Sequence, residues 1–93
     1  MVKEVHAAHI LVERKDKAEK LLAELKAGGN FEEMAKKFSK CPSSRKGGDL
    51  GWFKRGAMVK EFEDPTFQAE KGQLVGPVKT DFGYHLIKII DQK

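Results

Sequence analysis

The chain is 93 residues long, with 40% apolar residues, 34% charged residues and a formal net charge of +4. A chain of this size buries roughly 60–65% of its unfolded surface, which suffices for one hydrophobic core but not for two. The apolar content excludes a disordered segment, and the basic residues form no dense block, so we interpret the charge mainly as a contribution to solubility. We therefore expect one globular domain over residues 1–93.

Cysteine usage and the N-terminal residues bear on the compartment. The chain has one cysteine, so no intrachain disulfide can form, and this favours a reducing environment. Residues 1–4 are not followed by the apolar core of a signal peptide, and no segment approaches the ~20 apolar residues that span a bilayer. The expectation is a cytoplasmic monomer that does not associate with membranes.

The chain begins with a predicted strand and a predicted helix. Residues 5–12 are apolar on both faces of a strand, which is typical of a central strand covered on both sides. In residues 15–27, apolar side chains recur at positions i, i+3, i+4 and i+7, which predicts an amphipathic helix. Gly28 and Gly29 end this helix, because glycine accepts the left-handed conformation that follows a last turn.

A second helix is predicted over residues 31–38. Asn30 is a good N-cap for it, and Glu33 stands at the third helical position, as in a capping box. A loop rich in glycine, serine and charge then runs from residue 39 to about residue 48. Up to this point the chain reads as a strand followed by helices.

The second half alternates short strands with short helical segments. A strand is expected at residues 50–53, and one helical turn at residues 59–62. Asp64 and Pro65 predict the start of a separate short turn, with the proline early in it.

Two strands complete the chain. Residues 74–79 contain Pro77, which has no backbone donor and therefore suits an edge strand. Residues 84–90 form the last strand. The order βα3βαβ2 predicts an α+β fold without an internal repeat or a second domain.

Two histidines interrupt the most apolar strands, His9 in the first and His85 in the last. A half-buried imidazole needs a polar partner. If the first and last strands pair at the centre of one sheet, each histidine supplies the hydrogen bond of the other. The simpler alternative is two separate core histidines satisfied by the backbone. His6 lies on the strand face opposite to His9, and we interpret it as structural.

The segments between and after these strands complete a specific combination of motifs. They read Gly47-Gly48-Asp49-Leu50-Gly51, Arg55-Gly56-Ala57-Met58, Glu61-Phe62 and Phe82-Gly83-Tyr84-His85. Together with His9, these motifs closely resemble the parvulin family of peptidyl-prolyl cis/trans isomerases, and the resemblance covers residues 9–90. It implies a four-stranded, mostly antiparallel, twisted sheet surrounded by about four helices.

The resemblance also implies the polar part of a site. It places His9 and His85 as the central histidine pair, and it implies that the hydroxyl of Thr80 extends their hydrogen-bond network. The physical role of such a network is to fix tautomers, since a neutral imidazole has one donor and one acceptor. The network orients the site and need not transfer protons.

The apolar part of the site is implied in the same way. The resemblance places Leu50, Met58 and Phe62 around the substrate proline ring, and Phe53 and Phe82 are further candidate members. Met58 and Phe62 are four residues apart, so one helical turn puts both on one face. Taken alone, each of these five side chains would be interpreted as part of the core.

Cys41 admits three roles. It is a small buried hydrophobe, or a nucleophile beside a histidine, or a polar group next to the substrate amide. Prolyl isomerisation makes and breaks no covalent bond, and some parvulins carry aspartate at the position of Cys41, so we favour the third role. Partial negative charge near the substrate carbonyl would disfavour the planar, charge-separated amide and assist rotation.

The expected function is a non-covalent peptidyl-prolyl isomerase that assists folding, with no cofactor and no metal. Its partners would be proline-containing peptides and unfolded protein clients. Some parvulins select phosphorylated serine or threonine through an arginine-rich insertion between the first strand and the first helix. Residues 13–16 are too short for such an insertion, so we expect the phosphate-independent class.

Three other classes of function fit the sequence less well. A non-catalytic chaperone would keep the apolar groove and lose the polar residues of the site. A nucleic-acid-binding domain would need clustered basic residues with exposed aromatic residues. A zinc site built from His6, His9, His85 and Cys41 is disfavoured, because His6 and His9 point to opposite faces of their strand.

Overall fold

The structure is a computed structural model that describes residues 2–93. Its elements follow in the order β1 (Glu4–Val12), α1 (Lys15–Lys26), α2 (Phe31–Phe38), the 3-10 helix η1 (Pro42–Lys46), β2 (Asp49–Lys54), α3 (Lys60–Gln68), β3 (Leu74–Thr80) and β4 (Gly83–Gln92). The predicted α+β fold is confirmed. The "about four helices" are three α-helices and η1, a single short 3-10 helix within what the sequence predicted to be a loop.

The four strands form one antiparallel sheet in the order β2-β1-β4-β3. The first and last strands are therefore adjacent and central, as predicted. In their register His9 lies opposite Ile87, and Leu11 lies opposite His85. Pro77 lies in β3, which is an edge strand, where its missing N–H interrupts no central ladder.

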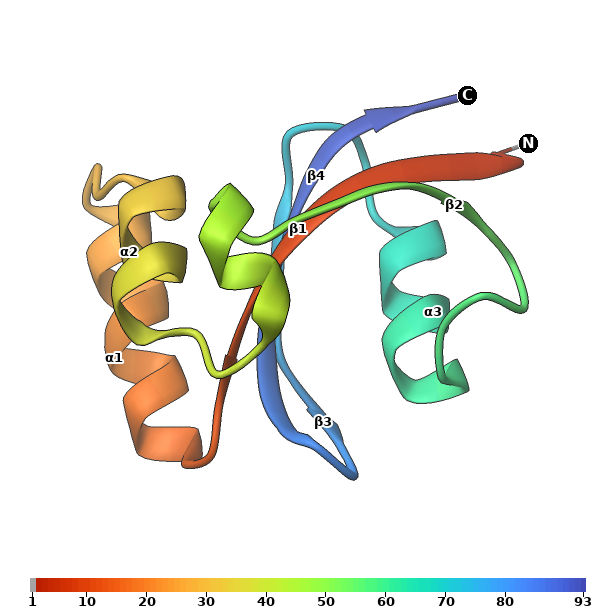
Figure 1. Ribbon diagram of the computed structural model, residues 1–93. Helices are drawn as coiled ribbons and strands as arrows, with labels where there is room; N and C mark the ends of the chain where they lie inside the picture. The colour runs from red at the N-terminus through yellow and green to blue at the C-terminus, as the bar shows by residue number, and fades with distance from the viewer. Residues whose placement is uncertain (1) are drawn as a thin grey trace.

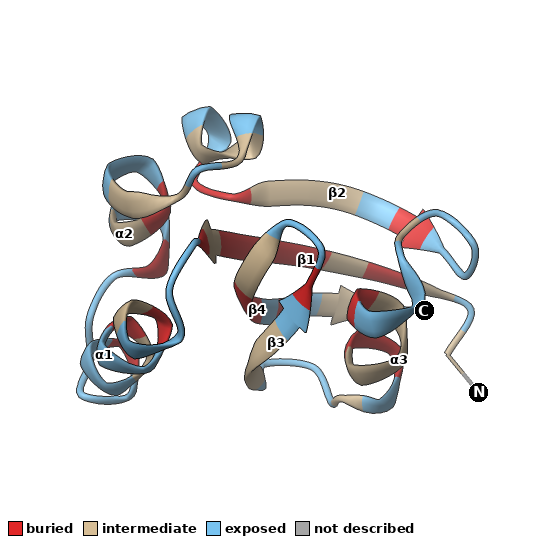
Figure 2. Ribbon diagram, turned by 90° about the horizontal axis from the view of Figure 1, so that it is seen from below, coloured by how far each residue is buried: buried red, intermediate tan, exposed pale blue. Residues whose placement is uncertain are grey.

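The twisted sheet is covered on both faces (Figure 1). Helices α1 and α2 pack on one face and α3 packs on the other. Each face has its own hydrophobic cluster, the first containing Ile10, Val12, Leu21 and Leu86, and the second containing Val5, Phe62, Phe67, Ile87 and Ile89. Figure 2 shows the buried residues concentrated along the central strands. This two-sided burial explains why β1 and β4 carry apolar residues on both of their faces.

Helix α3 differs from the prediction. It runs without a break over Lys60–Gln68, where the sequence predicted a single turn and a separate turn starting at Asp64. Pro65 lies inside the helix and supplies no N–H to the preceding turn. Burial of Phe62, Thr66 and Phe67 on one side of the helix outweighs this lost hydrogen bond. The Thr66 hydroxyl also donates to the Phe62 carbonyl at 2.7 Å.

Two local features position the segment before β2. The side chain of Asn30 accepts a hydrogen bond from the Glu33 N–H at 3.0 Å, which confirms the predicted N-cap of α2. Gly48 lies so close to β1 that a Cβ there would collide with the His9 carbonyl oxygen, and its φ is +87°. The His9 N–H donates to the Gly48 carbonyl at 2.9 Å. Glycine is therefore required where the chain enters β2 beside the histidine.

In the described part of the chain, every helix is too short or too polar to cross a lipid bilayer.

Candidate active site

A buried relay of three polar side chains runs across the centre of the sheet. His9 Nδ1 lies 2.9 Å from His85 Nδ1, and His85 Nε2 lies 2.7 Å from Thr80 Oγ1. The two imidazole rings are almost parallel, with an interplanar angle of 14°. This geometry confirms the prediction that the two histidines lie within hydrogen-bond reach on adjacent central strands.

The hydrogen bonds to Thr80 indicate the direction of the relay. The Phe82 N–H donates to Thr80 Oγ1 at 3.2 Å, so the hydroxyl hydrogen is available for His85 Nε2. His85 then carries its hydrogen on Nδ1 and donates it to His9 Nδ1, which leaves a hydrogen on His9 Nε2. The opposite direction would leave both the Thr80 hydroxyl hydrogen and His9 Nε2 without a partner. We assign the first direction because it leaves fewer buried groups unsatisfied.

His9 Nε2 is the remaining unsatisfied atom of the relay. It is buried, and no hydrogen-bond partner for it exists among residues 2–93. His9 is one of the residues that line the cavity described below. An unsatisfied buried N–H is costly, and such groups in proteins often mark functional sites.

Both histidines are held in the neutral form. Burial, and to a smaller extent repulsion from His85, lowers the pKa of His9 to about 4. Burial alone lowers the pKa of His85 to about 4. At neutral pH the relay therefore presents hydrogen-bonding groups without a net charge.

An apolar cavity of about 510 Å³ opens beside the relay, on the sheet face that carries α3. Its wall combines β1, the start of η1, the start of β2, the segment before α3, and the turn before β4. The lining residues are His9, Leu11, Lys40, Cys41, Pro42, Leu50, Ala57, Met58, Val59, Phe62, Phe82 and His85. The size and the few polar groups are typical of a small-ligand or side-chain socket.

Phe62 separates the apolar cavity from the core. Its ring stands almost perpendicular to both imidazoles, at 84° to His9 and 82° to His85, with centroids 5.6 and 5.2 Å away. Phe62 is buried and belongs to the second hydrophobic cluster. It also lines the cavity, as Leu50 and Met58 do. The relay and the apolar wall are thus held in one packed unit.

Most of the residues implied by the resemblance come together here, and two do not line the cavity. Thr80 is outside the cavity lining, and its hydroxyl is hydrogen-bonded to His85 Nε2 and to the Phe82 N–H. Phe53 is buried in the core against Phe67, with ring centroids 5.8 Å apart. It pairs with Val5, four residues before His9, which corresponds to ~13 Å along the strand. The structure therefore places Phe53 in the core and outside the lining of the cavity, unlike the other predicted members of the apolar socket.

Cys41 lies in the cavity wall as a half-buried free thiol at the start of η1. Both nitrogens of His85 are used within the relay, and His9 Nε2 has no partner among the described residues. Neither imidazole is therefore hydrogen-bonded to the thiol as a base would be to a nucleophile. The geometry fits a polar group beside a bound amide better than it fits an attacking thiolate.

Five lining residues were not identified from the sequence: Leu11, Lys40, Pro42, Ala57 and Val59. Leu11 follows His9 by two residues and so shares its strand face, a signal that strand alternation contains. Lys40 and Pro42 flank Cys41, and Ala57 and Val59 flank Met58. Their positions depend on how two loops fold over the sheet, which no local pattern specifies.

The residues considered for a zinc site are not assembled. His6 Nε2 lies 2.8 Å from the Asp49 carboxylate, at a different place from the relay. Among residues 2–93, no group of three His, Cys, Asp or Glu side chains is arranged to hold a metal ion.

Comparison with known proteins gives a consistent match along the whole chain. The family described as the PPIC-type PPIase domain matches residues 1–93. Foldase protein PrsA 1 of Bacillus cereus is 50% identical over 91 residues, which are 97% of this chain and 32% of the relative. Foldase protein PrsA of Geobacillus sp. strain WCH70 is 48% identical over 90 residues. The chain spans about a third of the length of these curated relatives.

Solved structures agree in fold. The crystal structure of the peptidylprolyl isomerase PrsA from Bacillus anthracis superposes with a TM-score of 0.96 at 42% identity, over 99% of this chain and 43% of that chain. The solution structure of NmPin, the parvulin of Nitrosopumilus maritimus, gives a TM-score of 0.87 at 39% identity, over 96% of this chain and 97% of that chain.

Proposed function

The chain belongs to the PPIC-type, or parvulin, family of peptidyl-prolyl cis/trans isomerases, and on that basis we propose that it is a folding catalyst for flexible client segments. In this proposal it accelerates rotation about Xaa-Pro bonds without a covalent intermediate. One observation carries the mechanism: an apolar socket lies directly against a buried, neutral histidine relay. The foldases among its relatives support a role in folding.

The socket would lower the barrier to rotation of the amide by excluding water from it. Rotation about a prolyl bond faces a barrier of ~18–20 kcal/mol, because the planar amide is stabilised by charge-separated resonance. A proline ring held by Leu50, Met58 and Phe62 would place this amide in a site with few polar groups. Exclusion of water favours the twisted, less dipolar amide. Lowering the barrier by ~5 kcal/mol accelerates rotation roughly 4,000-fold.

The same socket would release its client quickly. Burial of one proline ring contributes only about 1.5–3 kcal/mol, which corresponds to weak binding before other contacts are counted. Weak ground-state binding leaves the interactions available for the transition state. This is the behaviour that a catalyst with a broad range of clients requires.

We propose that the enzyme needs no phosphate on its client. Only Glu13 and Arg14 connect β1 to α1, so an arginine-rich insertion has no place in this connection. The guanidinium of Arg14 is bound to the Asp16 carboxylate, at 3.1 and 3.0 Å. Arg45 and Lys46 lie in η1, outside the lining of the socket, and would give at most a salt-sensitive preference for an acidic residue before proline.

A protease-coupled assay on a panel of Xaa-Pro peptides tests this proposal. The panel includes alanine, leucine, glutamate and phosphoserine before proline. We expect acceleration with the apolar residues, and a strong loss for Met58→Ala with the fold retained by circular dichroism. A preference of a hundredfold or more for phosphoserine that persists at high salt would contradict the proposal.

A monomeric state and a cytoplasmic location stay predictions. The first is tested by sedimentation at several protein concentrations, where a mass that rises with concentration would contradict it. The second is tested by fractionation of the native host with an antibody against this domain.

A further inference from the structure

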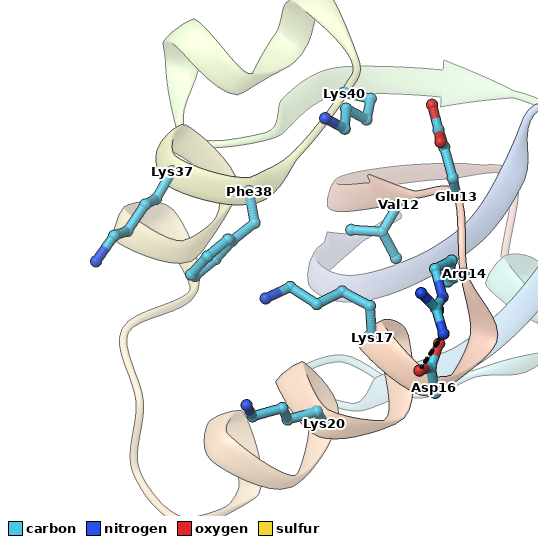
Figure 3. Close-up of a pocket in the computed structure, with 9 residues that line it drawn as sticks. All are labelled: Val12, Glu13, Arg14, Asp16, Lys17, Lys20, Lys37, Phe38 and Lys40. Atoms are coloured by element: carbon cyan, nitrogen blue, oxygen red, sulfur yellow. Dashed lines mark hydrogen bonds and ion pairs between the residues drawn. The ribbon is translucent and has the colours of Figure 1, made fainter.

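A second cavity, distinct from the proline socket, lies between the end of β1, α1 and α2. Its volume is about 460 Å³. Figure 3 shows five cationic side chains around it, those of Arg14, Lys17, Lys20, Lys37 and Lys40. Glu13 and Asp16 are its two acidic residues, so five positive charges less two negative ones leave a formal charge of +3. We call this feature the basic cavity.

The acidic residues of the basic cavity do not neutralise its lysines. The Asp16 carboxylate is bound by the guanidinium of Arg14. Among residues 2–93, no carboxylate oxygen lies within 4.0 Å of the ammonium group of Lys17, Lys20, Lys37 or Lys40. Four unpaired positive charges around one hollow produce a field that attracts anions.

The ring of Phe38 makes cation–π contacts with two of these lysines. The ammonium group of Lys17, from α1, lies 4.2 Å from the centre of the Phe38 ring, and that of Lys37, from α2, lies 5.6 Å from it. In Figure 3 the ring lies between the two ammonium groups. Attraction to the ring offsets part of the repulsion between the two like charges, so one cation from each helix is retained beside the same ring.

Lys40 lines both the basic cavity and the proline socket, so the two separate cavities are neighbours at this residue. Lys40 directly precedes Cys41, and its N–H donates to the Leu11 carbonyl at 2.8 Å, which fixes its backbone beside β1. A client whose proline occupies the socket would therefore have flanking residues within reach of the basic cavity.

On the basis of the proposed isomerase function, we propose that the basic cavity is an accessory site for acidic residues of the client, a few residues away from the proline. The apolar floor formed by Val12 and Phe38 would contact the methylene groups of glutamate, and the lysines would pair with its carboxylate. The shared residue Lys40 places the basic cavity next to the socket, which favours a peptide over a nucleic acid or a lipid surface. The site would recruit acidic clients without requiring phosphate.

Matched peptides test this inference. Each has an Ala-Pro core and a block of three glutamates, or three glutamines, that begins two to six residues before or after the proline. Six extended residues span at most ~20 Å, close to the 21 Å of the shortest dimension of the molecule. At low salt we expect a kcat/KM about three- to tenfold higher for at least one glutamate peptide than for its glutamine partner, as two or three exposed ion pairs would give. The gain should vanish at 1 M salt, where the Debye length is ~3 Å.

Two triple variants locate the effect. Lys17→Gln/Lys20→Gln/Lys37→Gln should abolish the glutamate gain and keep the rate on the glutamine peptides, whereas the control Arg45→Gln/Lys46→Gln/Lys54→Gln should retain the gain. Lys40 is left intact because it lines the socket. The absence of a gain, its survival in the first variant, or its equal loss in the control would overturn the inference. Failure of the isomerase proposal is distinct, because the glutamine peptides would then show no acceleration.

Binding to vesicles of phosphatidylcholine and phosphatidylserine, in a three-to-one ratio, distinguishes a client site from a membrane site. We expect no more than weak, salt-sensitive binding that both triple variants reduce alike. Strong vesicle binding lost only in Lys17→Gln/Lys20→Gln/Lys37→Gln, without a glutamate gain, would assign the basic cavity to a lipid surface and overturn the proposal.

Discussion

At the scale of single residues, the site depends on a few polar groups held in an apolar setting. The relay from Thr80 through His85 to His9 is satisfied at one end by the Phe82 N–H and ends at an unpartnered nitrogen beside the socket. Thr80 does not line the socket itself, and its hydroxyl is hydrogen-bonded to His85 Nε2, so Thr80 acts by positioning His85.

Removal of the Thr80 hydroxyl should therefore disturb orientation. Thr80→Val keeps the shape of the side chain and leaves His85 Nε2 without a donor, so we expect a loss of about 1–3 kcal/mol in the free energy of unfolding and a lower kcat. Urea unfolding and the protease-coupled assay measure the two effects. Thr80→Ser is the control and should recover most of both. If Thr80→Val kept full activity, the positioning role would be disproved.

Cys41 tests whether the site works by charge or by nucleophilic attack. Cys41→Asp should retain a substantial part of the isomerase activity, because a carboxylate supplies negative charge beside the amide, whereas Cys41→Ala should lose more. The comparison is made on kcat/KM for an Ala-Pro peptide, with the fold of each variant checked by circular dichroism. If the folded aspartate variant were as inactive as the alanine variant, the hypothesis that Cys41 acts through its negative charge would be contradicted.

At the scale of elements, the prediction from sequence succeeded where one local rule decides the structure. The N-cap of α2, the edge position of the Pro77 strand and the central pairing of the histidine strands all followed from such rules. The predicted break at Asp64-Pro65 was wrong: α3 continues past Pro65, because burial of Phe62, Thr66 and Phe67 in the core stabilises the helix. No local signal could decide between these two outcomes.

The candidate site was predictable to a similar extent. The histidine pair was found because polar residues are unusual in an apolar strand, and the Cys41 and Met58 segments were found through family motifs. Phe53 lies in the core and not in the socket lining, because the strand register pairs it with Val5, and this register could not be read from the sequence. Lys40 was missed because its place depends on the approach of a loop to β1.

The approach of β2 to β1 can be tested at two glycines. Gly48 and Gly51 both have positive φ, +87° and +71°, but a Cβ on Gly48 would meet the His9 carbonyl whereas one on Gly51 meets nothing within 4 Å. Alanine at Gly51 should cost about 1–2 kcal/mol of unfolding free energy from backbone conformation alone. Alanine at Gly48 should cost clearly more and reduce activity. Equal losses in urea unfolding of the two variants would contradict the steric argument.

At the scale of the whole molecule, the buried histidines connect stability to pH. Their pKa values are about 4 in the folded protein, against an ordinary value of 6.5 in the unfolded chain. Between pH 6.5 and pH 4 the unfolded chain binds more protons, so the free energy of unfolding should fall as the pH is lowered through this window. The stabilisation is complete above pH 6.5.

Urea unfolding at several pH values from 4 to 7 measures this dependence. The double variant His9→Asn/His85→Asn is the control, and it should show a shallower slope between pH 6.5 and pH 4 even if its stability is lower throughout. An unchanged slope would mean that other groups, and not the relay, bind the protons on unfolding.

The central claim is that this domain catalyses rotation about a prolyl bond non-covalently, and nuclear magnetic resonance exchange spectroscopy tests it without a coupling protease. An Ala-Pro peptide is observed with a catalytic amount of the protein at a mixing time below one second, whereas the unaided rotation takes tens to hundreds of seconds. The account predicts cis-to-trans exchange peaks that appear with the protein, are absent without it, and weaken strongly for Met58→Ala. Peptide resonances that shift on binding while no exchange peaks appear would contradict it, because the folded domain would then bind proline without catalysing its rotation.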